Sequence, residues 1–357
     1  MSEKSELRLF DEPLPQVVVD HGNYVDIQPS TGFNKNSTNL EFNIHASETE
    51  YLDLNDTVFY LKLKVMGANN TNLPATAAVL PANYFMNALF KDITLSLNDT
   101  IVEGGNHMYS YKSTIECIFN FSGDSKKYQL ESMGYNESDD ERKKLIVGSK
   151  VCELMGALRL DFFNQPKYLL PGVNVRLSLT RNNDKFALQG GGASNPTINI
   201  MEAKMYVRRA RVNPDVIKGQ ELGLVKKNAI YPYTRGQTIS YTIPQGSHSH
   251  FHNNLFSSSL LPKFVVVGFV KSTAFNGDGL DDSPYKFEDF KVSSIGLFRD
   301  GQSLPYRELY NTNFKDRLCV KAYMKSIIHN TQHLNTNFNN GISYEQFVNG
   351  TYTFFTF

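Results

Sequence analysis

The sequence predicts an all-β fold of the sandwich type, because the dominant hydrophobic period is two. From about residue 40 onward, apolar and polar residues alternate along many short segments, as in strands that bury one face. Turns rich in Gly, Pro and Asn separate these segments. Segments with helical spacing are few. We therefore expect antiparallel β-sandwiches with a few short helices in the loops.

Residues 1–38 are predicted to form an N-terminal arm. The segment is polar and rich in turn residues, and its one short extended run is Gln16–Val19. Its apolar residues are too frequent for a free tail, so we expect the arm to lie against a sheet of its own chain or of a neighbour.

Residues 39–212 are predicted to form the first strand-rich domain. In Thr57–Met66, Phe59 and Leu61 fall on one face, while Lys62 and Lys64 fall on the other. Similar runs predict strands at Leu40–Ala46, Asp92–Asn98, Ala157–Phe163, Val173–Thr180 and Thr197–Val212. The charged stretch Asn136–Lys144 is predicted to be a surface loop.

Residues 236–357 are predicted to form a second strand-rich domain. The expected strands are Gln237–Ile243, Phe264–Lys271, Lys291–Arg299, Arg317–Met324 and Thr351–Phe357. Between the two domains, residues 213–235 are predicted to be a helical linker, in which Asn213 caps a helix that begins at Pro214. A further helix is expected at His107–Phe121, capped by Asn106.

Composition excludes several classes of function. The 36 basic and 36 acidic side chains balance to zero formal charge, so the chain lacks the positive charge of a dedicated nucleic-acid binder, and genome contact is at most indirect. The three cysteines are far apart and form no C-x-x-C pair, so neither a disulfide framework nor a zinc ribbon is expected. No apolar run approaches the length of a membrane span.

Three alternating histidines are the sharpest candidate for a chemical site. His248, His250 and His252 would share one face of a strand and could hold a metal ion together. Cupin enzymes bind metal through an H-x-H pair followed by a glutamate, but here no Glu follows until Glu288. The competing interpretation is a polar loop tip after Pro244. We expect no bound cofactor, no catalytic residues and no metal, with the triplet kept as a weak candidate.

A basic group is the second candidate. Lys204, Arg208, Arg209 and Arg211 could contact phosphate or an acidic partner, or could be the solvated face of a strand. Phosphate-loop and nucleophile-elbow motifs are absent. The sequence therefore does not predict an enzyme.

Sequence blocks along most of the chain resemble the major capsid protein of Polinton (Maverick) elements and the related adintoviruses. The blocks stand in the family's order, and among them are SELRLFDEP (5–13), YVDIQPSTGF (24–33), EYLDLNDTVFYLKLKV (50–65), NALFKDITLSLND (87–99), LRLDFFNQPKYLLPGVNVRLSLTRNNDKFAL (158–188), LPKFVVVGFVKSTAFNG (261–277) and NGISYEQFVNGTYTFFTF (340–357).

The resemblance implies a double jelly roll: two eight-stranded sandwiches side by side in one chain, joined at residues 213–235. It implies a hexon-like homotrimer that tiles an icosahedral virion capsid, with penton and minor capsid proteins as partners and assembly in the host nucleus. The family continues with further strands beyond the position of Phe357, so we expect the second jelly roll to be incomplete in this chain. The family usually has polar, non-histidine residues at His248, His250 and His252.

Two other functions remain open from the residues alone. Aromatic side chains make up 12% of the chain, and many lie in expected turns. They could stack on sugars in a jelly-roll lectin or adhesin, or they could pack under loops and subunits. The histidine triplet would instead support a cupin-like metalloenzyme.

Overall fold

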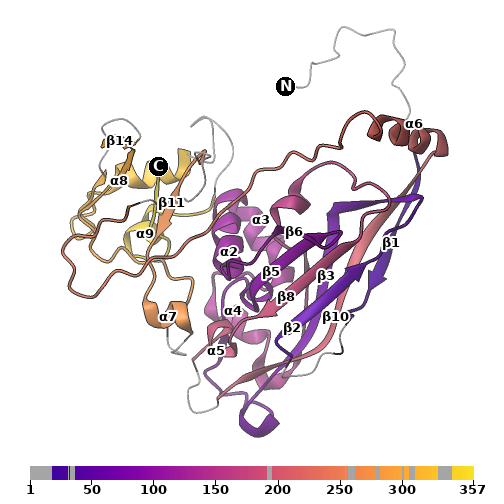
Figure 1. The fold of residues 1–357 in the computed structure, drawn as a ribbon. Helices are drawn as coiled ribbons and strands as arrows, with labels where there is room; N and C mark the ends of the chain where they lie inside the picture. Colours follow the sequence, from indigo (N-terminus) through magenta and orange to yellow (C-terminus); the bar gives the residue numbers. More distant parts are fainter. Residues whose placement is uncertain are drawn as a thin grey trace, which may run out of the picture.

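The computed structural model describes residues 18–30, 32, 37–190, 195–253, 255, 262–277, 282–299, 301–304, 310–328 and 340–357. Figure 1 shows an N-terminal half, coloured indigo to magenta, beside a C-terminal half coloured orange to yellow. Helix α6 (Pro214–Leu224) lies at one end of the N-terminal half. The chain then runs from this helix across to the other half (Figure 1).

The N-terminal half is built on eight strands in two sheets. The strands are β1 (Val19–Ile27), β2 (Asn39–Ile44), β3 (Glu50–Met66), β5 (Phe90–Leu97), β6 (Thr100–Glu103), β7 (Val151–Gly156), β8 (Val175–Arg181) and β10 (Thr197–Val212). One sheet has the order β1-β10-β3-β7, and the other has the order β2-β8-β5-β6. All pairings within these sheets are antiparallel.

The pairing of these strands is nested. Counted along the chain, the first strand pairs with the eighth (β1 with β10), the second with the seventh (β2 with β8), the third with the sixth (β3 with β7) and the fourth with the fifth (β5 with β6). An eight-stranded double sheet with this connectivity is a jelly roll. The all-β prediction is confirmed, and one jelly roll is complete within residues 19–212.

The first strand lies in the segment expected to be an arm. β1 pairs with β10 from Val19↔Val212 to Ile27↔Met205, so this part of the segment lies on a sheet of its own chain. The sheet thus begins at Val19, well before residue 39. Residues 1–17, and with them the first half of the run Gln16–Val19, lie outside the described residues.

The apolar residues of the period-two pattern form the core between the two sheets. Along β3, alternate residues from Phe59 to Val65 are buried, with at most 1% of each exposed. Phe59 packs edge-on against Phe42 of β2 and Phe90 of β5, with ring centroids 5.9 and 5.8 Å apart. Burying such rings removes some 150–250 Å² of surface each from water and supplies much of the free energy that holds the two sheets together.

Most short elements of this half lie in the connections between strands. They are η1 (Ala68–Asn70), β4 (Leu80–Pro81), α1 (Phe85–Ala88), α2 (Tyr109–Asn120), α3 (Gly123–Tyr128), η2 (Leu130–Met133), α4 (Asp139–Lys144), η3 (Val147–Ser149), η4 (Asp161–Asn164), α5 (Asp184–Ala187) and β9 (Leu188–Gln189). β4 pairs with β9. The connection from β6 to β7 holds α2, α3 and α4, and Figure 1 shows these helices on the side of the sandwich that faces the C-terminal half.

Helix α2 confirms the expected helix but begins at Tyr109. His107 has φ +55°, in the left-handed region, so the residue expected to open the helix cannot be helical. Asn106 still accepts a hydrogen bond from the Met108 backbone N–H at 3.2 Å. For α6, the prediction is confirmed: Asn213 Oδ1 accepts from the Asp215 N–H at 3.0 Å, and Pro214 is the first helical residue.

Two predicted strands are wrong. Ala157–Phe163 ends in the 3₁₀ turn η4, because Phe162 and its neighbour Phe163 are both buried, which a strand with one buried face does not allow. Arg317–Met324 enters helix α8 (Val320–Ile328), because Cys319, Ala322 and Ser326 are buried at helical spacing.

Two further expectations are corrected. Asn136–Lys144 is not all loop, since α4 forms with acidic residues in its first turn and basic residues in its last, as the helix dipole favours. Gln237–Ile243 lies in no strand, and its backbone pairs with none of the described residues.

The described strands of the C-terminal half form three two-stranded sheets. β11 (Val266–Gly268) pairs with β16 (Phe354–Thr356), β12 (Ser294–Ile295) with β15 (Tyr310–Asn311), and β13 (Leu297–Arg299) with β14 (Gln302–Leu304). The helices are α7 (Ser272–Asn276), α8 and α9 (Tyr344–Val348). A second jelly roll in this half stays a prediction. Among the described residues, no helix is long and apolar enough to cross a membrane.

Candidate functional site

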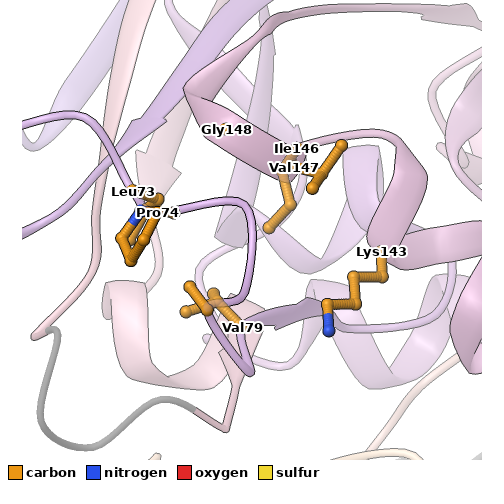
Figure 2. A pocket seen from close by; sticks show the side chains of 8 residues that line it. Leu73, Pro74, Val79, Lys143, Ile146, Val147 and Gly148 are labelled. Carbon is orange, nitrogen blue, oxygen red and sulfur yellow. The ribbon is translucent and has the colours of Figure 1, made fainter.

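The hollow shown in Figure 2 is too small for a substrate. It lies between the connection after β3 and the segment around η3, and Leu73, Val79, Lys143 and Ile146 line it. Its volume is about 10 Å³, room for roughly one water molecule, whereas ligand pockets measure about 300–1,000 Å³. A wider, open hollow of about 490 Å³ lies beside the edge strand β7, lined by Lys62, Lys150 and Glu153 among others.

The histidine triplet lies in an exposed segment after α6 that forms neither helix nor strand and has a turn at residues 245–246. The rings of His250 and His252 are 6.4 Å apart, and the His252 ring lies 3.6 Å from that of Tyr241. His248, His250 and His252 are all exposed. Within the described ranges, no group of three or more His, Cys, Asp or Glu side chains is placed to hold a metal ion. A metal site at the triplet stays a weak prediction.

The predicted basic group is spread along β10 and is largely neutralised by acidic neighbours. Lys204 Nζ lies 2.6 Å from Glu202, and Arg208 lies 2.5 Å from Asp56. Arg209 lies 3.1 Å from Glu50 and also donates to the carbonyl of His45 at 3.0 Å.

Arg211 is exposed, and it makes no ion pair within the part of the chain that the structure describes. The geometry of the other three residues agrees with the solvated face of a strand. A phosphate or acidic-partner contact through the group stays a prediction.

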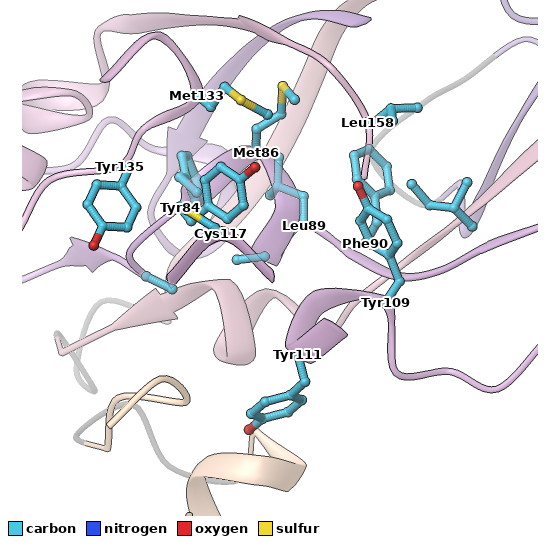
Figure 3. Packing of buried hydrophobic residues seen from close by; sticks show 14 of the residues in the cluster. Tyr84, Met86, Leu89, Phe90, Tyr109, Tyr111, Cys117, Met133, Tyr135 and Leu158 are labelled. Atoms are coloured by element: carbon cyan, nitrogen blue, oxygen red, sulfur yellow. The ribbon is translucent and has the colours of Figure 1, made fainter. Parts of the chain in front are cut away.

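An extensive set of side-chain contacts lies at the junction between the N-terminal and C-terminal halves. Tyr111 of α2 stacks on Phe275 of α7 with ring centroids 5.3 Å apart and meets Tyr285 and Phe287 edge-on at 5.8 and 6.4 Å. In Figure 3, Tyr111 points away from the other labelled side chains, toward a helix coloured as the C-terminal half. Phe119, two turns further along α2, packs against Phe354 at 5.2 Å.

Polar contacts cross the same junction. The buried ammonium of Lys126 in α3 donates to the carbonyls of Ile118 and Asn340, both at 2.6 Å. Burial lowers the pKa of Lys126 to about 8. Glu137 accepts hydrogen bonds from Tyr135 at 2.5 Å and from Tyr352 of the C-terminal half at 3.0 Å.

A third set of contacts holds the segment that leads into the C-terminal half. Lys112 of α2 donates to Glu103 and to Asp161, each at 2.8 Å, and Glu116 lies 3.6 Å away. The other oxygen of Asp161 accepts from the backbone N–H of Gly236 at 2.7 Å. We call Glu103, Lys112, Glu116 and Asp161 the carboxylate–lysine cluster.

Burial and charge shift the pKa values in this cluster. Burial would lower the pKa of Lys112, but Glu116, Glu103 and Asp161 outweigh it and raise that pKa. Burial raises the pKa of Glu116 to about 7 against the attraction of Lys112, and nearby Asp161 and Glu103 raise it further. Burial also raises the pKa of Asp161.

Sequence reasoning missed the residues of the carboxylate–lysine cluster. Lys112 and Glu116 are four residues apart in the expected helix, where Ile115, Ile118 and Phe119 form an apolar face. Two opposite charges at this spacing in a helix that is expected to be buried are the signal that could have pointed to an internal ion pair. No sequence pattern brings Asp161 or Gly236 to the same place, because only the fold does so.

No protein-family model matches the chain. A curated relative is the uncharacterized protein F54H12.2 of Caenorhabditis elegans, which is 25% identical over 334 residues, 89% of this chain and 79% of that protein.

The solved structures most similar to the chain include viral capsid proteins. The PBCV-1 virus capsid matches with a TM-score of 0.38 and 16% identity over 59% of this chain and 46% of the viral chain. The Faustovirus major capsid protein matches with a TM-score of 0.35 and 11% identity over 59% of this chain and 57% of the viral chain. The mavirus major capsid protein matches with a TM-score of 0.32 and 8% identity over 58% of this chain and 50% of the viral chain. The matches thus span about half the length of these viral proteins. The jelly-roll assignment rests on the strand order within the chain itself.

Proposed function

We propose that this chain is a structural shell protein, the major capsid protein of a virus or virus-like element, and that it has no enzymatic activity. The observation that carries the proposal is the complete eight-stranded jelly roll of residues 19–212, with its nested pairing. The sequence blocks that resemble Polinton and adintovirus capsid proteins select this function among those of jelly rolls.

In the proposed assembly, the C-terminal half supplies the second module of a double jelly roll. Three chains form a hexon-like trimer with six similar modules around its rim, and these capsomers tile an icosahedral virion shell by closed symmetry. Zero formal charge suits this role, because a strongly charged subunit would repel its many neighbours. Penton and minor capsid proteins would be the other partners, and assembly would take place in the host nucleus.

The junction supports the proposal because it is well packed. The ring contacts of Tyr111 and Phe119 join the two halves through apolar burial, and Lys126 joins them through hydrogen bonds to backbone carbonyls. A shell subunit needs its two modules held at a fixed angle, since their relative angle sets the geometry of each lateral contact.

Electron microscopy of the purified protein tests the proposal. We expect pseudo-hexagonal trimers, or closed particles built from them. Elemental analysis and a glycan-binding screen accompany it as controls. A metal bound in a one-to-one ratio to monomers would favour a cupin-like enzyme, and monomers that bind a glycan would favour a lectin, so either result would overturn the proposal.

A further inference from the structure

We propose that the carboxylate–lysine cluster is a pH-sensitive latch that holds the crossover, the segment of residues 225–253 that follows α6, against the N-terminal jelly roll at Gly236 and loosens as Glu116 loses its proton. The inference does not depend on the capsid function, since it rests on contacts within one chain. The cluster joins four parts of the fold: strand β6 through Glu103, helix α2 through Lys112 and Glu116, the start of η4 through Asp161, and the crossover through Gly236.

The hydrogen bonds of Glu103 and Asp161 are well satisfied. Besides Lys112, Glu103 accepts from the backbone N–H groups of Asp161 at 2.9 Å and Phe162 at 3.1 Å. Asp161 accepts from Lys112 with one oxygen and from Gly236 with the other. The side chains of Lys112, Glu103 and Asp161 are only 8%, 11% and 5% exposed, so these bonds are shielded from water.

Glu116 is the carboxylate of the cluster with the weakest charge compensation. Its only ion-pair partner among the described residues is Lys112, at 3.6 Å, and its side chain is 23% exposed. Arg159, which precedes η4, is the other cation that acts on it, and the neutral hydroxyl of Tyr109 on α2 also interacts with it. When Glu116 is ionised, three carboxylates compete for one ammonium group. When it is protonated, Lys112 is left to Glu103 and Asp161.

The sign of the pH effect follows from the raised pKa. Because the pKa of Glu116 is about 7 in the folded chain and near 4.5 when exposed, the folded state holds this proton more tightly. The contribution of Glu116 to stability is therefore fully present below about pH 4.5, falls as the pH rises above that value and is lost as the pH rises through about 7. We expect the anchor on Gly236 to be firm near pH 6 and weaker near pH 8.

The backbone at Gly236 is fitted to the cluster. A Cβ atom at this position would lie 3.1 Å from the Glu116 carboxylate and 3.1 Å from Cε of Lys112. A side chain there would push the ends of Glu116 and Lys112 back by a few tenths of an ångström. Glycine thus allows the backbone N–H to reach Asp161.

Trypsin provides a direct test, because the anchored N–H belongs to the Arg235–Gly236 peptide bond. The intact protein is digested briefly at pH 6 and pH 8, and cleavage after Arg235 is divided by cleavage after Lys227, an exposed residue earlier on the crossover. This internal ratio cancels the pH dependence of the protease. A synthetic peptide of residues 222–243 corrects for intrinsic site preference.

We expect the corrected ratio to rise about fivefold or more from pH 6 to pH 8 in the natural protein. It should stay low at both pH values in Glu116→Gln, which keeps the shape of the side chain and removes its charge, and it should be high at both in Asp161→Asn. Glu153→Gln, an exposed carboxylate on β7, should behave like the natural protein.

Hydrogen exchange of residues 232–240, measured on the same proteins after correction for intrinsic rates, serves as the second measurement. A ratio that does not change with pH in the natural protein, or that changes equally in Glu116→Gln, would overturn the proposal.

Discussion

The ammonium of Lys126 in the N-terminal half donates a 2.6 Å hydrogen bond to the backbone carbonyl of Asn340 in the C-terminal half. This contact joins residues 214 positions apart. It shows that the two halves share a buried polar tie as well as an apolar interface. A buried cation with backbone partners is costly to place, so its effect on stability depends on pH.

Lys126→Met should change the pH dependence of unfolding. Burial lowers the pKa of Lys126 from its ordinary value of 10.5 to about 8, so between these values the unfolded chain binds more protons than the folded one. In the natural protein this group makes the free energy of unfolding rise with pH from about 8 to 10.5. Urea unfolding of both proteins at pH 7 and pH 10 measures the effect. Equal pH slopes in the two proteins would contradict it, and Lys127→Met serves as the exposed control.

Tyr111→Ala should destabilise the junction strongly. The ring is 5% exposed and contacts four aromatic rings, and removing a buried aromatic ring costs about 3–5 kcal/mol. Urea unfolding measures the loss. Tyr128→Ala, where the ring is 65% exposed, is the matched control and should change stability by less than about 0.5 kcal/mol. Similar losses in the two variants would argue against a packed junction.

Tyr111→Phe should stabilise the protein, in contrast to Tyr111→Ala. The Tyr111 hydroxyl is buried and has no hydrogen-bond partner among the described residues. Removing an unpaired buried hydroxyl relieves a desolvation cost of about 1–3 kcal/mol, of which we expect to recover about 1. The same urea experiment reads this out. A loss of more than about 1 kcal/mol would show that the hydroxyl is bonded in solution.

Gly104→Ala should destabilise the jelly roll more than Gly105→Ala. Both glycines have positive φ, +109° and +85°, so an L-residue at either position is strained. Only at Gly104 would a Cβ atom collide with the backbone, 2.5 Å from the carbonyl oxygen of Ile93. We expect Gly104→Ala to cost at least about 1 kcal/mol more than Gly105→Ala, measured by thermal or urea unfolding. Equal costs would mean that β6 is displaced from β5 in solution.

Strand prediction succeeded where one face is buried and failed where packing departs from that rule. The strand predicted at Thr197–Val212 is confirmed with the same bounds as β10. This strand lies between β1 and β3, and buried residues alternate with more exposed ones along most of its length. Ala157–Phe163 carries the same pattern, yet Asp161 turns inward to Lys112 and Gly236 and the chain bends there. Period alone does not distinguish the two cases.

The junction could be predicted less well than the strands. Tyr111, Phe275 and Tyr285 are aromatic in the sequence, but Tyr111 lies 164 positions before Phe275 and 174 before Tyr285, so only the fold brings them together. The aromatic side chains in expected turns were predicted to pack either under loops and subunits or on sugars, and those at the junction pack within the chain. The carboxylate–lysine cluster depends on the fold in the same way.

The mass of the purified protein in solution tests the capsid account most directly. Native mass spectrometry and sedimentation velocity, at neutral pH and moderate salt, should give a particle of about three times the 40.4-kDa chain mass, or a larger multiple of that trimer. A protein that keeps the mass of a single chain at every concentration measured, including the highest, would contradict the account.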